Sequence, residues 1–180
     1  GSRILSYVGS VAPDTLLDRI ETELVQNNFQ CLESRHNPLR VTILNMLQSL
    51  AYEPHAFDRC VSLLLCVADH EDENNNYDAV RDKISGFFQP YLSGTHASLE
   101  QRLAIVVECL SSEDIGRRSL GTKLLSTALN GPPWTGFGLN EFGARPRDYG
   151  YSPNHDQLVE WRTAFINLAV RHANSDDQDI

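Results

Sequence analysis

The sequence predicts an all-α fold, an α-solenoid-like stack of helix pairs of the HEAT or TPR kind, and two observations carry this prediction. First, the stretch 38–69 aligns without a gap with the stretch 98–129, sixty residues further along the sequence. Apolar residues occupy matching positions in the two stretches, at helical spacing. Leu47 meets Val107, and Leu64 meets Leu124. A helix–turn–helix unit used twice is typical of repeat folds. Second, helix start and stop signals mark out about seven helices.

Each helix is expected where apolar residues recur at helical spacing between such signals. Pro13 and Asp14 open a helix near 14–28, and Pro38 fits the first turn of the next one, near 38–51. The other five are expected near 54–69, 77–88, 97–110, 112–129 and 155–172. Asn130-Gly131 followed by two prolines ends the sixth helix.

The segment 131–154 differs in kind, because it is rich in Gly, Pro and aromatic residues and has no helical period. We expect an ordered irregular loop before the last helix, since a loop of this length is usually functional or packed by its own side chains. Arg, Tyr and Trp dominate binding hot spots. The candidate partner-binding residues are therefore Trp134, Phe137, Arg145, Arg147, Asp148, Tyr149 and Tyr151.

Two interpretations of this loop stay open. In the first, Arg145 and Arg147 clamp a carboxylate or a phosphate of a partner. In the second, the aromatic side chains cap the end of the helical core, and Asp148 pairs with an arginine internally. A well-packed loop that still presents an arginine would satisfy both.

The organisation along the chain indicates one domain, 3–173, with a flexible acidic tail at 174–180. Gly1-Ser2 resembles an expression-tag remnant, and Arg3–Val8 opens directly in an apolar pattern. We therefore expect the chain to be a piece of a larger protein. With 180 residues it is long enough for one proper core.

Composition narrows the class of function. The net charge of −9 opposes general nucleic-acid binding, which depends on a basic surface. No uninterrupted apolar stretch approaches the roughly 18–20 residues of a membrane span. The four cysteines form no Cys-x-x-Cys pair, so we expect reduced, buried thiols and a cytoplasmic protein.

Motifs for chemistry are near misses. Gly116–Lys123 resembles a phosphate-binding loop, but Thr and Lys are reversed and no strand is expected before it; Gly121 is expected to allow close helix packing instead. Asp72, Asn74 and Asn76 imitate half of an EF-hand, without its glycine and its final glutamate. No metal-ligand spacing of His or Cys occurs. We therefore expect no cofactor, no metal and no catalytic residue.

Two stretches resemble a known group of proteins. They are Leu92–Leu103 (LSGTHASLEQRL) and Glu141–Gly150 (EFGARPRDYG), the latter followed by Asp156–Phe165 (DQLVEWRTAF). They are similar to segments in the helical-repeat regions of large bacterial STAND-type NTPase proteins and their sirtuin-like relatives. The likeness covers most of 38–168. In those proteins a catalytic module precedes the helical array, and several act in antiphage defence; this chain contains no such module, so no activity carries over.

Together these observations predict a noncatalytic interaction or sensor module, a fragment of a larger cytosolic bacterial protein, and the resemblance extends this to an antiphage NTPase. Its partner is expected to be a protein or another domain of the same polypeptide. One alternative is an enzyme fragment with a site at the aromatic loop, which predicts a pocket joining His155, Asp148 and an arginine. Another is a purely structural spacer, with the loop packed flat and no accessible arginine.

Overall fold

The computed structural model describes residues 9, 11–27, 29, 32, 38–70, 80–130, 141–142 and 145–176 of the chain. Within these residues the protein is helical apart from one short pair of strands. The all-α prediction is confirmed for this part of the chain. The helices are α2 (Pro13–Gln26), α4 (Pro38–Leu50), α5 (Pro54–Asp69), α6 (Val80–Gly86), α7 (Leu99–Leu110), α8 (Ile115–Asn130) and α9 (His155–Asp176).

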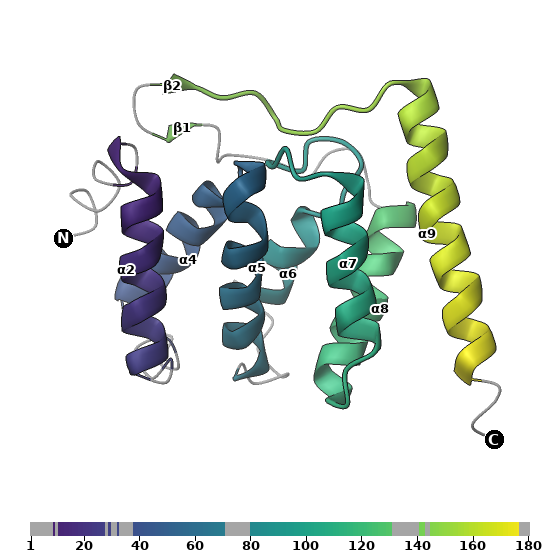
Figure 1. Cartoon of the computed structure of the whole chain (residues 1–180), viewed down its shortest axis with the longest axis horizontal. Helices are drawn as coiled ribbons and strands as arrows, with labels where there is room; N and C mark the ends of the chain where they lie inside the picture. The colour runs from purple at the N-terminus through teal and green to yellow at the C-terminus, as the bar shows by residue number, and fades with distance from the viewer. Residues whose placement is uncertain are drawn as a thin grey trace.

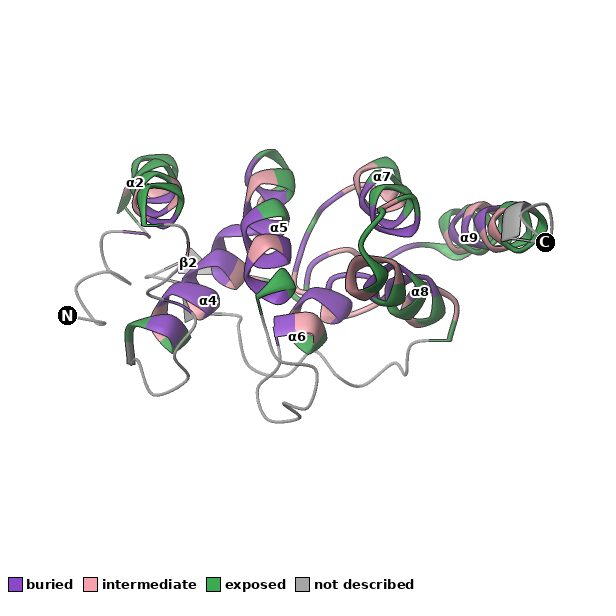
Figure 2. Ribbon diagram, turned by 90° about the horizontal axis from the view of Figure 1, so that it is seen from below, coloured by how far each residue is buried: buried purple, intermediate pink, exposed green. Residues whose placement is uncertain are grey.

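The helices lie in two layers, seen face-on in Figure 1 and from below in Figure 2. Helices α2, α5 and α7 form the front layer, and α4, α6 and α8 form the back layer, so that successive helices alternate between them. Close packing joins α7 to α8 and α5 to both α4 and α6. Helix α9 stands at one end of the row, against α7 and α8.

The core lies where the two layers meet. Leu47, Leu64 and Leu124 are fully buried there, each on a different helix. Phe57 of α5 meets Phe87 edge to face, with ring centroids 5.7 Å apart. Trp161 attaches α9, because its indole is buried and donates a hydrogen bond of 2.9 Å to the Ala128 carbonyl of α8. Each buried large apolar side chain contributes about 1.5–3 kcal/mol.

Capping residues explain where α7 and α8 begin. Ser98 and Gln101 form a reciprocal capping box, so α7 starts at Leu99. Helix α8 starts at Ile115 rather than near 112, because the Asp114 carboxylate accepts a hydrogen bond of 2.7 Å from the Arg117 amide. Asp114 thus caps the helix, and the residues before it form the turn.

The end of α9 also differs from the expectation. Helix α9 continues to Asp176, so residues 174–176 are helical and do not belong to a frayed tail. Its start is as expected, since Asn154 and Gln157 bond to each other's backbone amides at 2.9 Å. Helix α6 is described from Val80 only, and residues 77–79 lie outside the described residues.

The segment between α8 and α9 contains the two strands. β1 (Glu141–Phe142) and β2 (Arg145–Pro146) pair antiparallel, with Phe142 opposite Arg145. Figure 1 shows the chain running from β2 across the upper ends of the helices to the start of α9. This path brings residues 147–151 over loops that are far away in sequence.

Candidate functional site

The two stretches that carry the family resemblance lie against each other in the folded chain. We call residues 147–151 the strap and residues 89–98 the junction loop. The Gly94 amide donates to the Tyr149 carbonyl at 3.0 Å, and the Tyr151 amide donates to the Thr95 carbonyl at 2.7 Å. Two backbone hydrogen bonds therefore join segments that are about fifty residues apart in the sequence.

Gly150 permits this close approach. Its backbone has φ of +84°, and a Cβ atom built there would lie 2.5 Å from the Thr95 nitrogen and 2.6 Å from its oxygen. Neither atom can move away cheaply, because both belong to the backbone. A side chain at position 150 would therefore push the strap off the junction loop.

The junction loop is in turn bonded to the turn between α4 and α5. The His96 amide donates to the Tyr52 carbonyl at 3.0 Å, and the Thr95 hydroxyl donates to the Ala51 carbonyl at 2.5 Å. Thr95 is fully buried, so its hydroxyl needs such a partner. The α4–α5 turn, the junction loop and the strap thus lie one upon another.

Asp148 is the polar centre of this arrangement. Its Oδ1 accepts hydrogen bonds of 2.9 Å from the Tyr52 hydroxyl and the Gly150 amide, and it lies 2.8 Å from His96 Nε2. The Gly150 amide, followed by the Tyr52 and His96 side chains, lowers the pKa of Asp148. Burial, and then Asp148 itself, raises the pKa of Tyr52.

Arg147 attaches the strap to the end of α4 and to the α4–α5 turn. Its Nη1 donates to the Ser49 carbonyl at 2.7 Å, and its guanidinium carbon lies 4.3 Å from the centroid of the Tyr52 ring. Burial lowers the pKa of this half-buried arginine, which still stays a cation near neutral pH. The neighbouring side chain, Tyr149, is 55% exposed.

A buried arginine supports the junction loop from below. Arg102 of α7 has no exposed surface and donates to the Gln89 carbonyl, the Ser93 hydroxyl and the Thr95 carbonyl at 3.1–3.3 Å. Its guanidinium carbon lies 5.1 Å from the Tyr151 ring centroid and 5.0 Å from that of Trp161. Its Nε has no hydrogen-bond partner. Burial lowers the pKa of Arg102.

The candidate residues named from the sequence have different outcomes. Trp134 and Phe137 lie outside the described residues, and Arg145 is described only as a backbone position in β2. The other four, Arg147, Asp148, Tyr149 and Tyr151, all lie in the strap, and three of them contact neighbouring segments through their side chains.

Sequence reasoning did not anticipate the partners of these residues. Tyr52 lies in a turn with no motif, and Arg102 falls on a helix that its neighbours mark as ordinary. The histidine that faces Asp148 is His96 rather than His155, which opens α9. One signal was present, because Thr95, His96 and Arg102 all belong to the first stretch that carries the resemblance.

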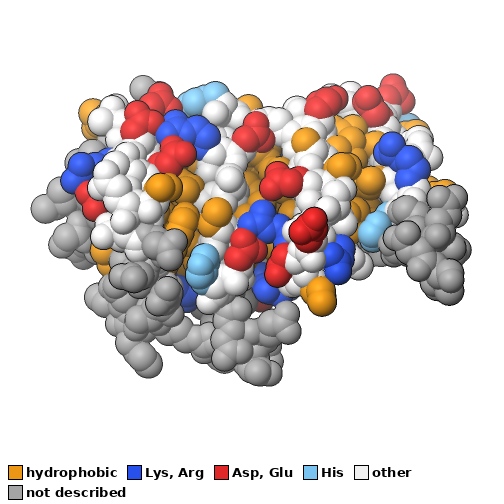
Figure 3. All heavy atoms as spheres, turned by 60° about the horizontal axis from the view of Figure 1, so that its bottom comes forward, with side chains coloured by type: hydrophobic (Ala, Val, Ile, Leu, Met, Phe, Trp, Pro, Cys, Tyr) orange, Lys and Arg blue, Asp and Glu red, His pale blue; other side chains and the backbone are white. Residues whose placement is uncertain are grey.

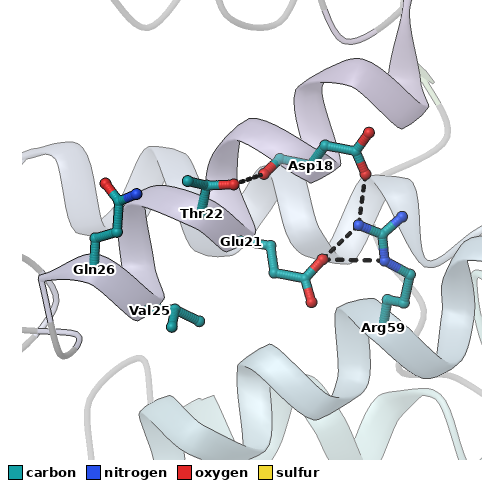
Figure 4. Close-up of a pocket in the computed structure, with 6 residues that line it drawn as sticks. All are labelled: Asp18, Glu21, Thr22, Val25, Gln26 and Arg59. Atoms are coloured by element: carbon teal, nitrogen blue, oxygen red, sulfur yellow. Dashed lines mark hydrogen bonds and ion pairs between the residues drawn. The ribbon is translucent and has the colours of Figure 1, made fainter.

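A second candidate is an open hollow of about 480 Å³ between α2 and α5, drawn in Figure 4. Arg59 of α5 points toward α2, where it contacts Asp18 at 2.7 Å and also pairs with Glu21. Thr22, Val25 and Gln26 complete the lining. The charged groups of this hollow thus bond to one another across the two helices.

The phosphate-loop-like motif 116–123 lies within α8, where Gly121 allows close helix packing as expected. Gly121 packs against the end of α7, since a Cβ atom there would lie 2.9 Å from the Leu110 nitrogen. Arg117 pairs with Asp69 and Glu108. Among the described side chains, no group of three His, Cys, Asp or Glu could hold a metal ion. Most of the EF-hand-like run lies outside the described residues.

Comparisons with known proteins add no relative. No family model matches the sequence, and neither curated proteins nor solved structures include one that is measurably similar. The resemblance to STAND-type and sirtuin-like proteins therefore stays a prediction. In the described part of the chain, no helix combines the length and the apolar character that crossing a bilayer requires.

Proposed function

We propose that this chain is a noncatalytic helical-repeat module that binds a protein partner or another domain of the same polypeptide. Its alternating helices would form a short α-solenoid, and such folds bind through the extended surfaces that their stacked helices create. We also propose that it belongs to a larger cytosolic bacterial protein of the STAND type, where it would act as a sensor or scaffold.

One observation carries the proposal of a protein partner. Val159, Ile166 and Val170 of α9 are 51%, 51% and 55% exposed. Their spacing of seven and four residues puts them on one face of the helix. The opposite face carries Trp161, Phe165 and Leu168, which are buried against the stack. An apolar row on the outside of an end helix is typical of a surface that another protein covers.

The face of the protein drawn in Figure 3 is mixed in character. On the face in Figure 3, acidic and basic side chains lie next to one another, with apolar side chains visible between them. The ion pairs of the described chain include those that Arg59 of α5 makes with Asp18 and Glu21 of α2. Exposed pairs of this kind contribute little binding energy. The outer face of α9 is therefore the favoured contact.

The geometry at the strap supports a structural role over a catalytic one. A nucleophilic relay uses both ring nitrogens of its histidine, one toward the nucleophile and one toward the carboxylate. Here the same nitrogen, His96 Nε2, lies 3.0 Å from the Tyr52 hydroxyl and 2.8 Å from Asp148. The three groups share hydrogen bonds that tie loops together.

The test places a photo-crosslinking amino acid at position 163, within the apolar row, and at position 104 on the exposed face of α7. We expect the probe at 163 to capture one defined protein or domain, which is then purified and titrated against the chain. Ile166→Glu should weaken that binding at least tenfold. Asn167→Glu is the matched control, because it adds the same charge to the next, exposed residue.

Equal weakening by both variants would point to charge rather than contact. Capture at neither position would leave the structural spacer as the better interpretation, and capture of a small-molecule substrate with turnover would favour an enzyme fragment.

A further inference from the structure

We propose that the strap is a latch: seated, it holds α5 and α7 together at the front of the stack, and its release lets the two halves of the stack move relative to each other. We call the boundary between α5 and α7 the front seam. The first half of the stack comprises α2, α4 and α5, and the second half comprises α7, α8 and α9.

The two layers are joined in different ways at this boundary. Behind the boundary, α6 packs closely against α5 of the front layer and α8 of the back layer, and its Val80 and Ile84 are buried. In the front layer, α5 is not among the close neighbours of α7, and Figure 2 shows the two helices well apart. The back layer can therefore serve as a hinge, because bending there opens the front.

Polar side chains bridge the front seam near its two ends. At the upper end, Gln101 of α7 donates to the Pro54 carbonyl at 2.9 Å and to Asp58 at 3.0 Å. At the lower end, Arg117 of α8 pairs with both Asp69 of α5 and Glu108 of α7. The Gln101 bonds at the upper end are exposed and worth little, since water replaces them readily, whereas the Arg117 pair at the lower end is partly buried. Besides the bonds of the junction loop to the α4–α5 turn, a further tie is needed to hold the upper end of the seam closed.

The strap supplies that tie because it is bonded to both halves at once. Toward the first half, Arg147 bonds to the Ser49 carbonyl and Asp148 accepts from the Tyr52 hydroxyl. Toward the second half, Tyr149 and Tyr151 pair with the junction loop, and the Tyr151 ring stacks on Trp161 of α9 at 5.8 Å between centroids. The strap also covers the point where the junction loop meets the α4–α5 turn.

The burial of Arg102 lowers the free-energy cost of releasing the strap. Its guanidinium is buried without a carboxylate among its described contacts, and burying a cation costs free energy that neutral oxygens offset only in part. Tyr151 forms one wall of its enclosure. When the strap lifts, water reaches Arg102, and its hydration offsets some of the bonds that are lost. This compensation is what a reversible latch requires.

The native cysteines report on the seam. Cys66 of α5 and Cys109 of α7 both interact with the guanidinium of Arg117, which spans the seam, whereas Cys60 faces the Arg59 and Glu21 side of α5. Burial raises the pKa of Cys109 to about 11 and that of Cys60 to about 12, so both thiols react slowly while the structure is closed.

The experiment measures maleimide labelling of Cys60, Cys66 and Cys109 at pH 8 in the whole chain, and mass spectrometry resolves the three sites. Gly150→Ala forces the strap off the junction loop, and Gly86→Ala is the matched control, because a Cβ atom at position 86 meets nothing within 4 Å. We expect Gly150→Ala to speed labelling of Cys66 and Cys109 at least tenfold and to leave Cys60 unchanged. Gly86→Ala should change none of the three.

A second variant protects the test against misfolding. Arg147→Ala combined with Asp148→Asn removes side-chain ties and leaves the backbone of the strap intact, and circular dichroism and urea unfolding show whether either variant keeps its helices. Faster labelling of Cys66 and Cys109 alone in a folded variant supports the latch. Unchanged labelling, or equal acceleration of all three cysteines, overturns it, because the strap would then either not hold the seam or merely stabilise the whole chain.

Discussion

The two units that match in sequence, α4–α5 and α7–α8, are alike in their second helices and differ in their first. Leu64 of α5 and Leu124 of α8 are both fully buried, as the overlay implies. Leu47 of α4 is also fully buried, but its counterpart Val107 of α7 is 43% exposed. The two helices lie in different layers, α4 at the back against α2 and α5, and α7 at the front against α8 and α9.

The same comparison explains Arg102. The overlay puts it opposite Thr42, which is only half-buried on α4. On α7 that position points into the space under the junction loop and the strap. Two helices with the same apolar pattern therefore contribute differently to stability. Substitutions at matched positions should lower the free energy of unfolding by different amounts.

The largest effect is expected at Arg102. Arg102→Met removes the hydrogen bonds of the guanidinium to the Gln89 carbonyl, the Ser93 hydroxyl and the Thr95 carbonyl, and its contacts with the rings of Tyr151 and Trp161. The free energy of unfolding should fall by about 3–5 kcal/mol. Thr42→Met, the matched change in the first unit, should cost less than about 1 kcal/mol. Urea titration measures both, and equal costs would mean that Arg102 plays no special part.

The next largest effect is expected at the aligned positions Leu47, which is buried, and Val107, which is partly exposed. Leu47→Ala creates a cavity in the core and should lower the free energy of unfolding by about 2–4 kcal/mol. Val107→Ala, at the corresponding position, should lower it by about 0.5 kcal/mol or less, because water already covers much of that side chain. Thermal unfolding tests this, and a similar loss in the two variants would contradict the difference in layer.

In the second helices of the two units, Gly121 of α8 aligns with Val61 of α5, and the two positions differ in the space around them. The Cα of Gly121 lies too close to the end of α7 for a side chain. Gly121→Ala should destabilise the protein by about 1–3 kcal/mol through overpacking. Gly86→Ala meets open space and should be nearly neutral. An unchanged melting temperature for Gly121→Ala would show that α7 and α8 can move apart freely.

The smallest effect is a dependence on pH at the α4–α5 turn, which the strap covers. The pKa of Asp148 is lowered in the folded state, so the folded protein holds this proton less tightly than the unfolded chain does. Its contribution to stability is complete above the ordinary aspartate pKa of about 4, and it is lost as the pH falls through the lowered value.

Asp148→Asn should therefore lower stability at pH 7 by about 1 kcal/mol or less, and the difference from the wild type should vanish in acid. Unfolding free energies measured from pH 7 down to pH 2 check this. A difference in unfolding free energy between the wild type and the variant that stays constant over that range would mean that the charge of the carboxylate does not stabilise the strap.

Much of the helical framework could be read from local signals. Pro13, Pro38 and Pro54 stand at or next to the first residue of α2, α4 and α5, where a missing amide costs nothing. Ser98 and Asn154 cap the helices after them as their side chains suggest. The start of α8 was misplaced by about three residues because several capping residues follow one another there, and only the fold selects Asp114.

The candidate site was predictable only in part. Arg147, Asp148, Tyr149 and Tyr151 were singled out because a short segment concentrates residue types that favour recognition, and the structure shows three of these side chains bonding to other segments of the chain. Tyr52 and His96 carried no comparable signal, since a tyrosine or a histidine in a turn is ordinary until its partner is known.

By itself, the order of residues determined which stretches become helices and which of their faces are apolar, because hydrogen bonding within a helix and the 3.6-residue period are local properties. Only the tertiary structure decided which layer each helix joins, that Arg102 is buried, and that Asp148 meets Tyr52 and His96. Those outcomes depend on contacts between residues up to about a hundred positions apart, and such contacts arise from how whole helices pack against one another.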